Sequence, residues 1–442
     1  MNLPFHVAFL PRPRRGVDLP GRKNTAGRRS VVLPIPDEVI LPMQQQIGAP
    51  CRPLVKAGDT VLVGQKIADS TAFVSAPIHA SISGKVAGTA KVFLAGGQPV
   101  EAVRIISDGK MAVSPDVAPP EIDSRSGFLA AVRASGLVGL GGAGFPARVK
   151  FAVPAGKSVD TLVVNAAECE PYITSDSRCA LEDTVQILRG ISAVKKWLEI
   201  RRVILAVENN QPDVIAAMKK ATEGNPGIRV VPLAVRYPQG AEKVLIEFCT
   251  GRRVPMGGLP ADVGCLVMNI SSAAALGEYL ETGMPLVRRR VTVDGSAVRN
   301  PQNVIAPVGT RIRTIMAFCG GYREAPKKIL MGGPMMGIAV SGDDLPIVKQ
   351  NNAILCLGDE EAHRMKPTAC IRCGRCVRVC PMHLMPLMLE KFTAAKRVDE
   401  LQAYSVTDCM ECGSCAYSCP AGRPLVQAIR LGKAMVKGKG KK

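Results

Sequence analysis

Two runs of cysteine near the end of the chain constrain its fold more than any other feature. The first run is Cys370, Cys373, Cys376 and Cys380 followed by Pro381, and the same spacing recurs in Cys409, Cys412, Cys415 and Cys419 followed by Pro420. Three thiolates at such intervals let one loop hold three corners of an iron–sulfur cube, while the cysteine before proline reaches a second cube. The runs therefore predict two [4Fe–4S] clusters with crossed ligands. Cys419 would complete the cluster of the first run, and Cys380 that of the second.

Zinc is the main alternative for these cysteines, because pairs of cysteine separated by two residues are also typical of zinc sites. Zinc ribbons combine two such pairs, however, and need neither the third cysteine of each run nor its final Cys-Pro. Between the runs, apolar residues recur at helical spacing at Met385, Met388, Leu389, Phe392 and Ala395. We therefore expect residues 360–435 to form a helical ferredoxin-type domain with two [4Fe–4S] clusters.

The composition is typical of a globular chain with several domains. Its 442 residues are 47% apolar and 21% charged, and this length predicts about three domains, each with its own core. No uncharged apolar run reaches the ~18 residues that cross a bilayer, and the first ten residues lack the basic start of a signal peptide. We expect a cytoplasmic protein, in which fifteen cysteines indicate metal or redox chemistry rather than disulfides.

The net charge of +20 is concentrated near the two ends of the chain. Residues 1–30, a basic lead, hold seven Lys or Arg against one acidic residue, and residues 361–442 hold fifteen against six. Such charge favours nucleic acid, anionic lipid or an acidic protein as partner. Because only 4% of residues are aromatic and no nucleic-acid motif is present, we expect no nucleic acid partner. Both charged ends are instead predicted to dock other subunits.

Two stretches predict small β modules. Residues 31–110 have short Val- and Ile-rich runs broken by Gly, Pro and Asp, and within them 55–67 and 76–86 resemble the halves of a lipoyl- or biotinyl-type barrel-sandwich domain. The lysine that would carry a prosthetic group is missing, so a structural or docking role is expected, with His79 as an ordinary surface or core histidine. Residues 286–350 predict a β-grasp module, with a hairpin at Asp294-Gly295 and a turn at 332–337.

The middle of the chain predicts a parallel α/β sheet, which makes the whole a multidomain α/β protein. Residues 125–285 alternate β-branched runs with helical stretches, and the expected strands are 161–165, 203–207, 228–235 and 265–270. Ligands of such sheets bind beyond the carboxyl ends of the strands. The polar or flexible residues there are Asn165, Glu168, Glu170, Glu208, Asn209, Tyr237, Gly240 and Asn269. They predict one ligand site at this rim.

A glycine-rich stretch, Gly139-Leu-Gly-Gly-Ala-Gly-Phe-Pro-Ala-Arg-Val-Lys150, precedes the first of these strands. It matches the dinucleotide pattern G-x-G-x-x-G, but that pattern follows a strand and opens a helix, whereas residues 128–135 have helical spacing. An ordinary glycine turn is equally compatible with the loop alone. Together with the polar rim, the stretch favours a loop whose bare backbone lets a flavin approach closely, with Lys150 supplying charge.

With these features together, the chain resembles the RnfC component of the Rnf (Rsx) ion-translocating electron-transport complex over nearly its whole length. The resemblance rests on the module order, the glycine loop, Asn165-Ala-Ala-Glu-Cys-Glu-Pro-Tyr172, Gly251-Arg-Arg-Val-Pro255, Leu259-Pro-Ala-Asp-Val-Gly264, the 332–337 turn and the cysteine runs. The middle of the chain is also similar to the flavin-bearing, NADH-oxidising subunit of respiratory complex I. One departure is Arg15-Gly-Val-Asp18, which stands where the family has Gly-Gly-x-His.

The resemblance implies FMN, two [4Fe–4S] clusters and NAD(H) as substrate. The implied FMN contacts are Gly139, Gly141, Gly142, Lys150, Asn165, Glu168, Gly240 and Asn269, and Phe145, Glu170 and Glu242 would lie near the nicotinamide. NADH would give hydride to FMN, and single electrons would pass through the clusters to RnfB, the iron–sulfur subunit of an Rnf-type complex. Its membrane subunits would couple this flow to Na⁺ or H⁺ transport. A peripheral subunit on the cytoplasmic side of the inner membrane is expected.

Two alternatives remain open at this level. A soluble relative, such as a cobalamin reductase or a donor to a terminal reductase, would carry the same cofactors, but in that cobalamin reductase the barrel module follows the flavin loop, whereas here it precedes it. The other alternative is a ferredoxin-like docking subunit with no flavin site. The glycine loop, with Asn165 and Glu168, argues against it.

Overall fold

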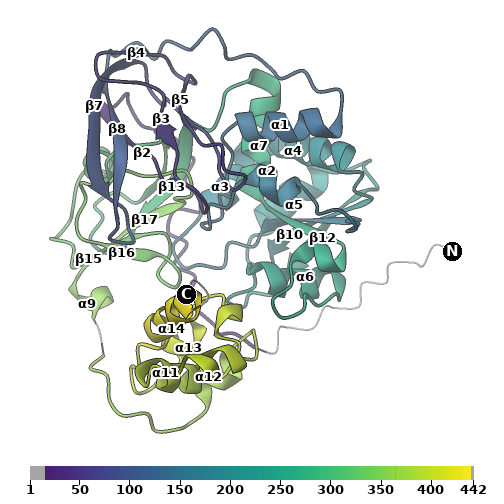
Figure 1. Cartoon of the computed structure of the whole chain (residues 1–442), viewed down its shortest axis with the longest axis vertical. Coiled ribbons are helices and arrows are strands. Elements are labelled where there is room, and N and C mark those ends of the chain that lie inside the picture. The colour runs from purple at the N-terminus through teal and green to yellow at the C-terminus, as the bar shows by residue number, and fades with distance from the viewer. Residues whose placement is uncertain (1–14, 364, 440–442) are drawn as a thin grey trace.

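The computed structural model describes residues 15–363 and 365–439, and its first module consists of two antiparallel sheets (Figure 1). Their orders are β2-β8-β7-β4 and β3-β5-β6. The strands are β2 (Glu38–Pro42), β3 (Arg52–Pro53), β4 (Thr60–Val61), β5 (Lys66–Asp69), β6 (Ile78–His79), β7 (Gly84–Phe93) and β8 (Pro99–Ser107). Both sheets contribute to one apolar core, which includes Leu41, Ile67 and Ile105. His79 is a core histidine, and burial lowers its pKa to about 3.

The second module is the predicted parallel sheet, with the order β11-β10-β9-β12. Its strands are β9 (Thr161–Ala166), β10 (Arg202–Glu208), β11 (Ile228–Leu233) and β12 (Cys265–Asn269). Their apolar side chains alternate between two cores because successive strand residues point to opposite faces. Leu162 and Val164 belong to one core, and Val163 belongs to the other. All four predicted strands are present, and the third ends two residues before its predicted end.

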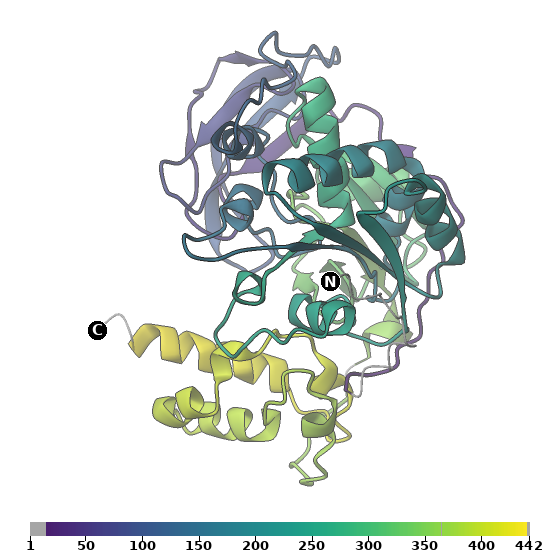
Figure 2. The ribbon, with the colours of Figure 1, turned by 90° about the vertical axis from the view of Figure 1, so that its right-hand side faces the viewer.

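Helices cover both faces of this sheet, as Figures 1 and 2 show. The helices are α1 (Arg125–Ala134), α2 (Ala147–Phe151), α3 (Ser175–Glu182), α4 (Thr184–Trp197), α5 (Pro212–Ala221), α6 (Glu242–Thr250) and α7 (Ile270–Thr282), with the 3-10 helix η1 (Pro260–Val263). Phe128 of α1, Ile191 of α4 and Leu276 of α7 lie in the core with Leu162. Leu245 and Ile246 of α6 pack with Val163 on the other face. The carboxyl ends of the strands are therefore held between two helical layers.

The third module is a mixed sheet of order β1-β14-β13-β17-β15-β16. Its elements are β1 (Val31–Val32), β13 (Arg288–Asp294), β14 (Gln302–Pro307), α8 (Ile312–Phe318), β15 (Lys328–Met331), β16 (Ile338–Val340) and β17 (Ala353–Leu357). The turn at 332–337 joins β15 to β16, as predicted. Residues 295–301 join β13 to β14, so Asp294-Gly295 is not a two-residue hairpin turn. Gly295 has a φ of +112°, and an added Cβ would lie 2.3 Å from the Cys356 carbonyl oxygen.

One strand lies in a different sheet from the one that its place in the sequence suggested. Val31–Val32 opens the stretch that predicted the barrel, yet β1 pairs in parallel with β14 of the mixed sheet. Leu33 continues this contact, because its amide donates to the Ile305 carbonyl at 2.9 Å and its side chain is buried in the core of the mixed sheet. The chain therefore passes through the third module before it enters the barrel.

The cysteine-rich part is a separate helical domain, at the lower end of the molecule in Figures 1 and 2. It contains the short helix α9 (Asp359–Ala362) on its approach, then α10 (Arg375–Val379), α11 (Pro386–Ala394), α12 (Val398–Ala403), η2 (Val406–Asp408), α13 (Ser414–Tyr417) and α14 (Leu425–Lys439). Leu389, Phe392 and Ile429 belong to its own apolar core. The predicted helix between the cysteine runs is α11. Within residues 15–363 and 365–439, no helix has the length and apolar character needed to span a bilayer.

Candidate flavin and cluster sites

The rim of the parallel sheet brings several predicted residues together. Asn165 at the end of β9 lies in register with Asn269 at the end of β12. The Asn165 side chain donates to the Gly240 carbonyl at 2.8 Å, and the Asn269 side chain accepts from Ser272 N at 3.2 Å, which caps α7. An added Cβ at Gly141 would lie 3.2 Å from Asn269 Nδ2. The glycine loop and the ends of β9 and β12 therefore form one surface.

The glycine loop is a closed turn with an open outer face. Gly139 N donates to Phe145 O at 2.8 Å, and Gly144 N donates to Gly139 O at 3.1 Å. Gly142 has a φ of +110°, and an added Cβ there would meet no atom within 4 Å. Helix α1 precedes the loop, so it lacks the strand that a dinucleotide fingerprint requires. The half-buried Phe145 closes the turn.

Lys150 and Glu242 also meet at this rim. Lys150 on α2 donates to Glu242 Oε2 at 2.5 Å and to Val267 O at 3.0 Å. Glu242 lies in the first turn of α6, and both side chains are about one-third exposed. An ammonium has three N–H donors, so Lys150 has a third donor for an anionic or carbonyl oxygen of a ligand.

Glu168 is a buried residue beside the rim that stabilises the start of helix α3. It is 6% exposed, and its carboxylate accepts from Asp176 N at 2.7 Å and from Ser177 Oγ at 2.5 Å, so it caps α3. No sequence signal points to its neighbour Asp176, which accepts from Asn269 Nδ2 at 2.6 Å. Burial and the nearby Glu168 raise the pKa of Asp176 to about 6. The Glu168 carboxylate is therefore linked to Asn269 through α3 and Asp176.

The turn at 332–337 encloses the carboxylate of Glu170. The amides of Met335 and Met336 donate to Glu170 at 3.0 and 2.8 Å. An added Cβ at Gly333 would lie 2.3 Å from Glu170 Oε2, which explains why the turn has a glycine there. Burial raises the pKa of Glu170 to about 7. From sequence this stretch was only a turn, whereas the structure shows that it fixes a predicted site residue.

Buried polar atoms near the rim have no hydrogen-bond partner among the described residues. They include Glu208 Oε1, both amide atoms of Gln239 and Gln350 Oε1. Burial raises the pKa of Glu208 to about 7. Gln239 precedes Gly240, and Gln350 packs beside Gly144 of the loop. Because buried polar groups normally have a partner, these atoms and the open face of the glycine loop fit a polar, planar ligand such as FMN.

Several cations in the described part of the basic lead bind within the chain. Lys23 donates from Nζ to the carbonyl oxygens of Glu168, Glu170 and Ile173 at 2.6, 2.9 and 2.6 Å. Arg15 donates to Val377 O at 2.8 Å, and Arg28 to Pro301 O at 2.9 Å. The sequence indicated this positive charge but not its intramolecular partners. Lys23 therefore holds the loop that carries two of the predicted site residues.

The eight cysteines line two separate spaces in the helical domain. Cys370, Cys373, Cys376 and Cys419 line one small space, and Cys380, Cys409, Cys412 and Cys415 line the other. We call the first group the outer set and the second the inner set. Both loops use left-handed residues at matching places, Arg372 and Gly374 in one and Glu411 and Gly413 in the other. The structure thus groups the cysteines as crossed ligation requires.

The two sets differ in their surroundings. Cys370 and Cys373 of the outer set are exposed, whereas Cys380, Cys412 and Cys415 of the inner set are at most 8% exposed. The inner set faces the α/β domain, because Tyr237 Oη donates to the Cys412 carbonyl at 2.6 Å. A group held by the inner set would therefore lie closer to the rim.

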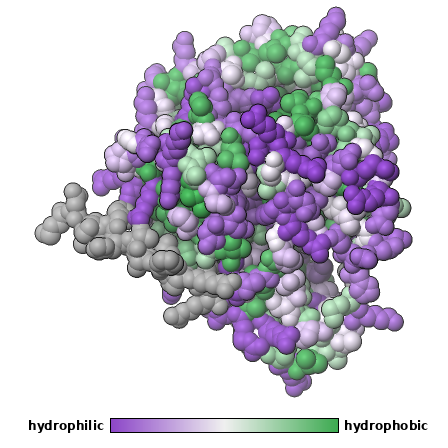
Figure 3. Space-filling model, turned by 180° about the vertical axis from the view of Figure 1, so that it is seen from behind, coloured by the Kyte–Doolittle hydropathy of each residue, from purple (hydrophilic) through white to green (hydrophobic). Residues whose placement is uncertain are grey.

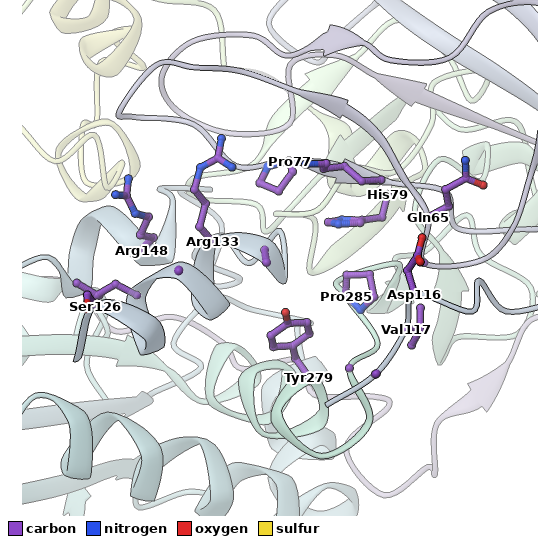
Figure 4. Close-up of a pocket in the computed structure, with 17 residues that line it drawn as sticks. Gln65, Pro77, His79, Asp116, Val117, Ser126, Arg133, Arg148, Tyr279 and Pro285 are labelled. Atoms are coloured by element: carbon purple, nitrogen blue, oxygen red, sulfur yellow. The ribbon is translucent and has the colours of Figure 1, made fainter. Parts of the chain in front are cut away.

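A cavity of about 620 Å³ lies elsewhere, between the barrel and α1 (Figure 4). His79 and Tyr279 lie on two sides of it, and Arg133 in its wall is paired with Asp69 at 2.6 Å. None of its lining residues is a predicted site residue. The cavity and the flavin rim are therefore different features of the protein.

Comparison with known proteins assigns the modules to families. The RnfC barrel sandwich hybrid domain matches residues 12–110, the Nuo51 FMN-binding domain 132–278, the SLBB domain 290–339 and the 4Fe-4S dicluster domain 369–423. The RnfC-type subunit of the proton-translocating ferredoxin:NAD(+) oxidoreductase complex of Clostridium ljungdahlii is 45% identical, over 92% of this chain and 90% of that protein. The chain belongs to the RnfC family. The predicted family and the predicted cofactors, FMN and [4Fe–4S], are thereby confirmed.

Further RnfC relatives agree with this assignment. The equivalent subunit of the Na(+)-translocating complex of Acetobacterium woodii is 43% identical, over 90% of each chain. That of the ion-translocating oxidoreductase complex of Pseudomonas aeruginosa is 41% identical, over 96% of this chain and 55% of that protein. The air-oxidised NAD+-reducing [NiFe]-hydrogenase matches with a TM-score of 0.50 at 17% identity, over 69% of this chain and 63% of that chain. At that identity the match supports the fold alone.

Proposed function

We propose that this chain is the peripheral electron-transfer subunit of an Rnf-type, ion-translocating ferredoxin:NAD⁺ oxidoreductase complex, on the cytoplasmic side of the inner membrane. One observation carries the proposal: a rim in an FMN-binding domain and a set of four cysteines, three of them buried, are joined through Tyr237 in a single chain. The named relatives are subunits of complexes that move H⁺ or Na⁺, which favours a complex subunit over a soluble reductase.

The residues of the rim would bind and orient FMN and NAD(H). The open backbone of the glycine loop would receive the flavin, with Lys150 and Asn269 as polar contacts, while Glu170 and Glu242 would lie on the nicotinamide side. FMN supplies the conversion between hydride and single-electron chemistry, and the clusters carry the single electrons. NADH oxidation here is the reverse of the reaction in the relatives' names, in which ferredoxin is the donor and NAD⁺ the acceptor.

The surroundings of the cysteines support an order for the two clusters. Three cysteines of the inner set are buried and Cys412 of this set contacts the α/β domain, whereas the outer set has two exposed cysteines. Electrons from the rim would therefore reach the inner set first and leave from the outer set. The module boundaries proposed with this path are a basic lead at 1–30, a barrel at 31–110, the FMN domain at 125–285, a β-grasp module at 286–350 and the cluster domain at 360–435.

The surface beside the outer set suits an acidic iron–sulfur partner. Arg372, Arg375 and Arg378 are exposed there and have no carboxylate within salt-bridge distance among the described residues, and Ile371 is 67% exposed. In Figure 3 hydrophilic side chains predominate on the face shown, and some apolar ones appear at its lower end. Since Arg15, Lys23 and Arg28, in the described part of the basic lead, bind within the chain, we place docking at this surface of the cluster domain.

Anaerobic purification tests the proposed function. We expect a flavin absorption band, roughly eight iron atoms per chain from two [4Fe–4S] clusters, and bleaching of the flavin band on titration with NADH. A chain with full iron content but no flavin would instead be a ferredoxin-like docking subunit. An iron content near four, or bound zinc, would contradict the two-cluster assignment.

Crossed ligation makes a prediction about Cys419. We expect Cys419→Ser to damage the same cluster as Cys373→Ser, because both cysteines line the outer space. Cys412→Ser, in the same sequence run as Cys419, should damage the other cluster. Electron paramagnetic resonance of each reduced variant identifies the signal that is lost. If Cys419→Ser lost the signal that Cys412→Ser loses, the ligation would be uncrossed.

Charge-driven docking makes a prediction about salt. Raising salt from 0.1 to 1 M shortens the Debye length from about 10 Å to about 3 Å, so a high-salt wash should release this subunit from membranes without detergent. Arg372→Glu combined with Arg375→Glu should release it at low salt. Arg229→Glu, on β11 of the α/β domain, is the control and should remain bound. Retention that is insensitive to both salt and charge reversal would indicate an apolar interface instead.

A further inference from the structure

Tyr237 connects the α/β domain to the inner set of cysteines. Its side chain is 3% exposed, and its hydroxyl donates to the Cys412 carbonyl at 2.6 Å. Its backbone is held on the other side by Val17, with Val17 N to Tyr237 O at 2.8 Å and Tyr237 N to Val17 O at 3.0 Å. The neighbouring Gly16 donates to Val379 O at 3.0 Å. Tyr237 is thus fixed by both its main chain and its side chain.

The same segment of chain reaches the flavin rim three residues later. Gly240 O accepts from the Asn165 side chain at 2.8 Å. An added Cβ at Gly240 would lie 2.6 Å from Ala167 O, so the segment is pressed against the loop that follows β9. The stretch from Tyr237 to Gly240 therefore contacts the flavin rim at one end, through Gly240, and the loop of cluster-ligand cysteines at the other, through Tyr237.

Apolar side chains fill the space around this connection. Tyr237, Val17 and Cys412 form one buried cluster, with Cys169 and Met335 packed against it. Burial raises the pKa of Tyr237 far above its usual range. Val17, Tyr237 and Cys412 are all at most 7% exposed, so packing shields the contact between Tyr237 and the cysteine loop from water.

We propose that Tyr237 is a positioning residue that fixes the Cys409–Cys415 loop against the flavin rim and so sets the separation across which electrons pass. This inference rests on the proposed function, because it assumes a flavin at the rim and a cluster in the inner set. Tyr237 itself would gain and lose nothing: each electron that left a flavin at the rim would be taken up by a cluster in the inner set, and the phenol proton would stay on its oxygen. The role of Tyr237 is geometric.

The test is Tyr237→Phe, which keeps the ring and removes only the hydroxyl. Flavin content and the rate of flavin bleaching by NADH should match the wild type. Electron arrival at the cluster, followed by rapid-mixing absorption under anaerobic conditions, should slow roughly three- to tenfold, as expected when one buried hydrogen bond no longer holds the loop. The electron paramagnetic resonance signal assigned to the inner set should change in shape, because Cys412 loses a contact.

Tyr322→Phe is the matched control. Tyr322 also donates one side-chain hydrogen bond, to Asp343 at 2.8 Å, but it lies in the mixed-sheet module, so transfer rate and cluster signal should be unchanged. An unchanged transfer rate and cluster signal in Tyr237→Phe would overturn the proposal. A wild type that binds no flavin would refute the proposed function instead. Reduction of both variants with dithionite would then still test the Tyr237 contact through the cluster signal alone.

Discussion

Replacing Gly142 by valine is expected to abolish FMN binding while the iron–sulfur absorption remains. Gly142 has a φ of +110°, which a β-branched residue rarely adopts. Its outward side faces open space, and a valine side chain there would occupy the volume that the flavin needs. The cluster domain has its own apolar core and should fold normally. Flavin absorption and iron content, measured on the same sample, give both results.

Gly224→Val is the control for strain without contact to the flavin. Gly224 also has a positive φ, +75°, and no atom within 4 Å of an added Cβ, but it lies in the turn after α5. This variant should keep its FMN. Full FMN occupancy and normal NADH reduction in Gly142→Val would place the flavin elsewhere. Lys150→Ala should weaken FMN binding by roughly ten- to hundredfold, since a charge-assisted contact contributes about 1.5–3 kcal/mol.

Replacing Lys23 by methionine is expected to have the second-largest effect. Methionine keeps most of the aliphatic length but removes the ammonium that three carbonyl groups accept from, those of Glu168, Glu170 and Ile173. Each such bond to a charged donor contributes about 1.5–3 kcal/mol. The loop should loosen, and FMN affinity should fall by roughly tenfold or more. Isothermal titration with FMN and the thermal midpoint measure the two consequences.

Arg28→Met is the matched control for Lys23→Met. Arg28 also belongs to the basic lead, but it donates to a single carbonyl, that of Pro301, on an exposed surface. The Arg28→Met variant should bind FMN with nearly the affinity of the wild type. If Lys23→Met bound FMN like the wild type, the lead would be a surface feature with no part in the flavin site, and the bonds to the three carbonyls would have no functional consequence.

The parts of the fold that could be predicted from the sequence are those that depend on patterns of neighbouring residues. The strands β9 to β12 are short β-branched runs between helical stretches, and the parallel arrangement follows from that alternation. The spacing of the cysteines is likewise a local pattern. Because each run ends in a Cys-Pro whose cysteine reaches the other cluster, the spacing also predicts the two sets of four. The position of Asn165 and Asn269 at one rim follows from strand direction alone, because the carboxyl ends of parallel strands meet at one edge.

The contacts that sequence missed join residues far apart in the chain. Lys23 binds carbonyl groups about 145–150 residues away, and Arg15 binds Val377, 362 residues away. Every residue has a main-chain carbonyl, so the residue types in the sequence do not show which carbonyls accept a hydrogen bond from a distant cation. The intramolecular partners of these cations could therefore not be predicted. Glu168 was recognised as a rim residue, but its direction toward α3 depends on Ser177 and on how α3 packs. Asp176 was missed because the side chains that donate to it, those of Asn269 and Ser271, lie 93 and 95 residues away in the sequence.

The pairing of Gly16 with Val379 and of Val17 with Tyr237 also has a consequence for how the protein is made. The residues that meet where the two redox domains join come from the N-terminal part of the chain (Gly16 and Val17), its middle (Tyr237) and its C-terminal part (Val379). Since domains fold largely as they emerge from the ribosome, the flavin domain can be complete on the order of ten seconds before the final partner of Arg15 is synthesised. The segment around Gly16 must wait for its last contacts until the cluster domain exists. Protease sensitivity near Gly16 should therefore report how many molecules in a preparation have finished assembly.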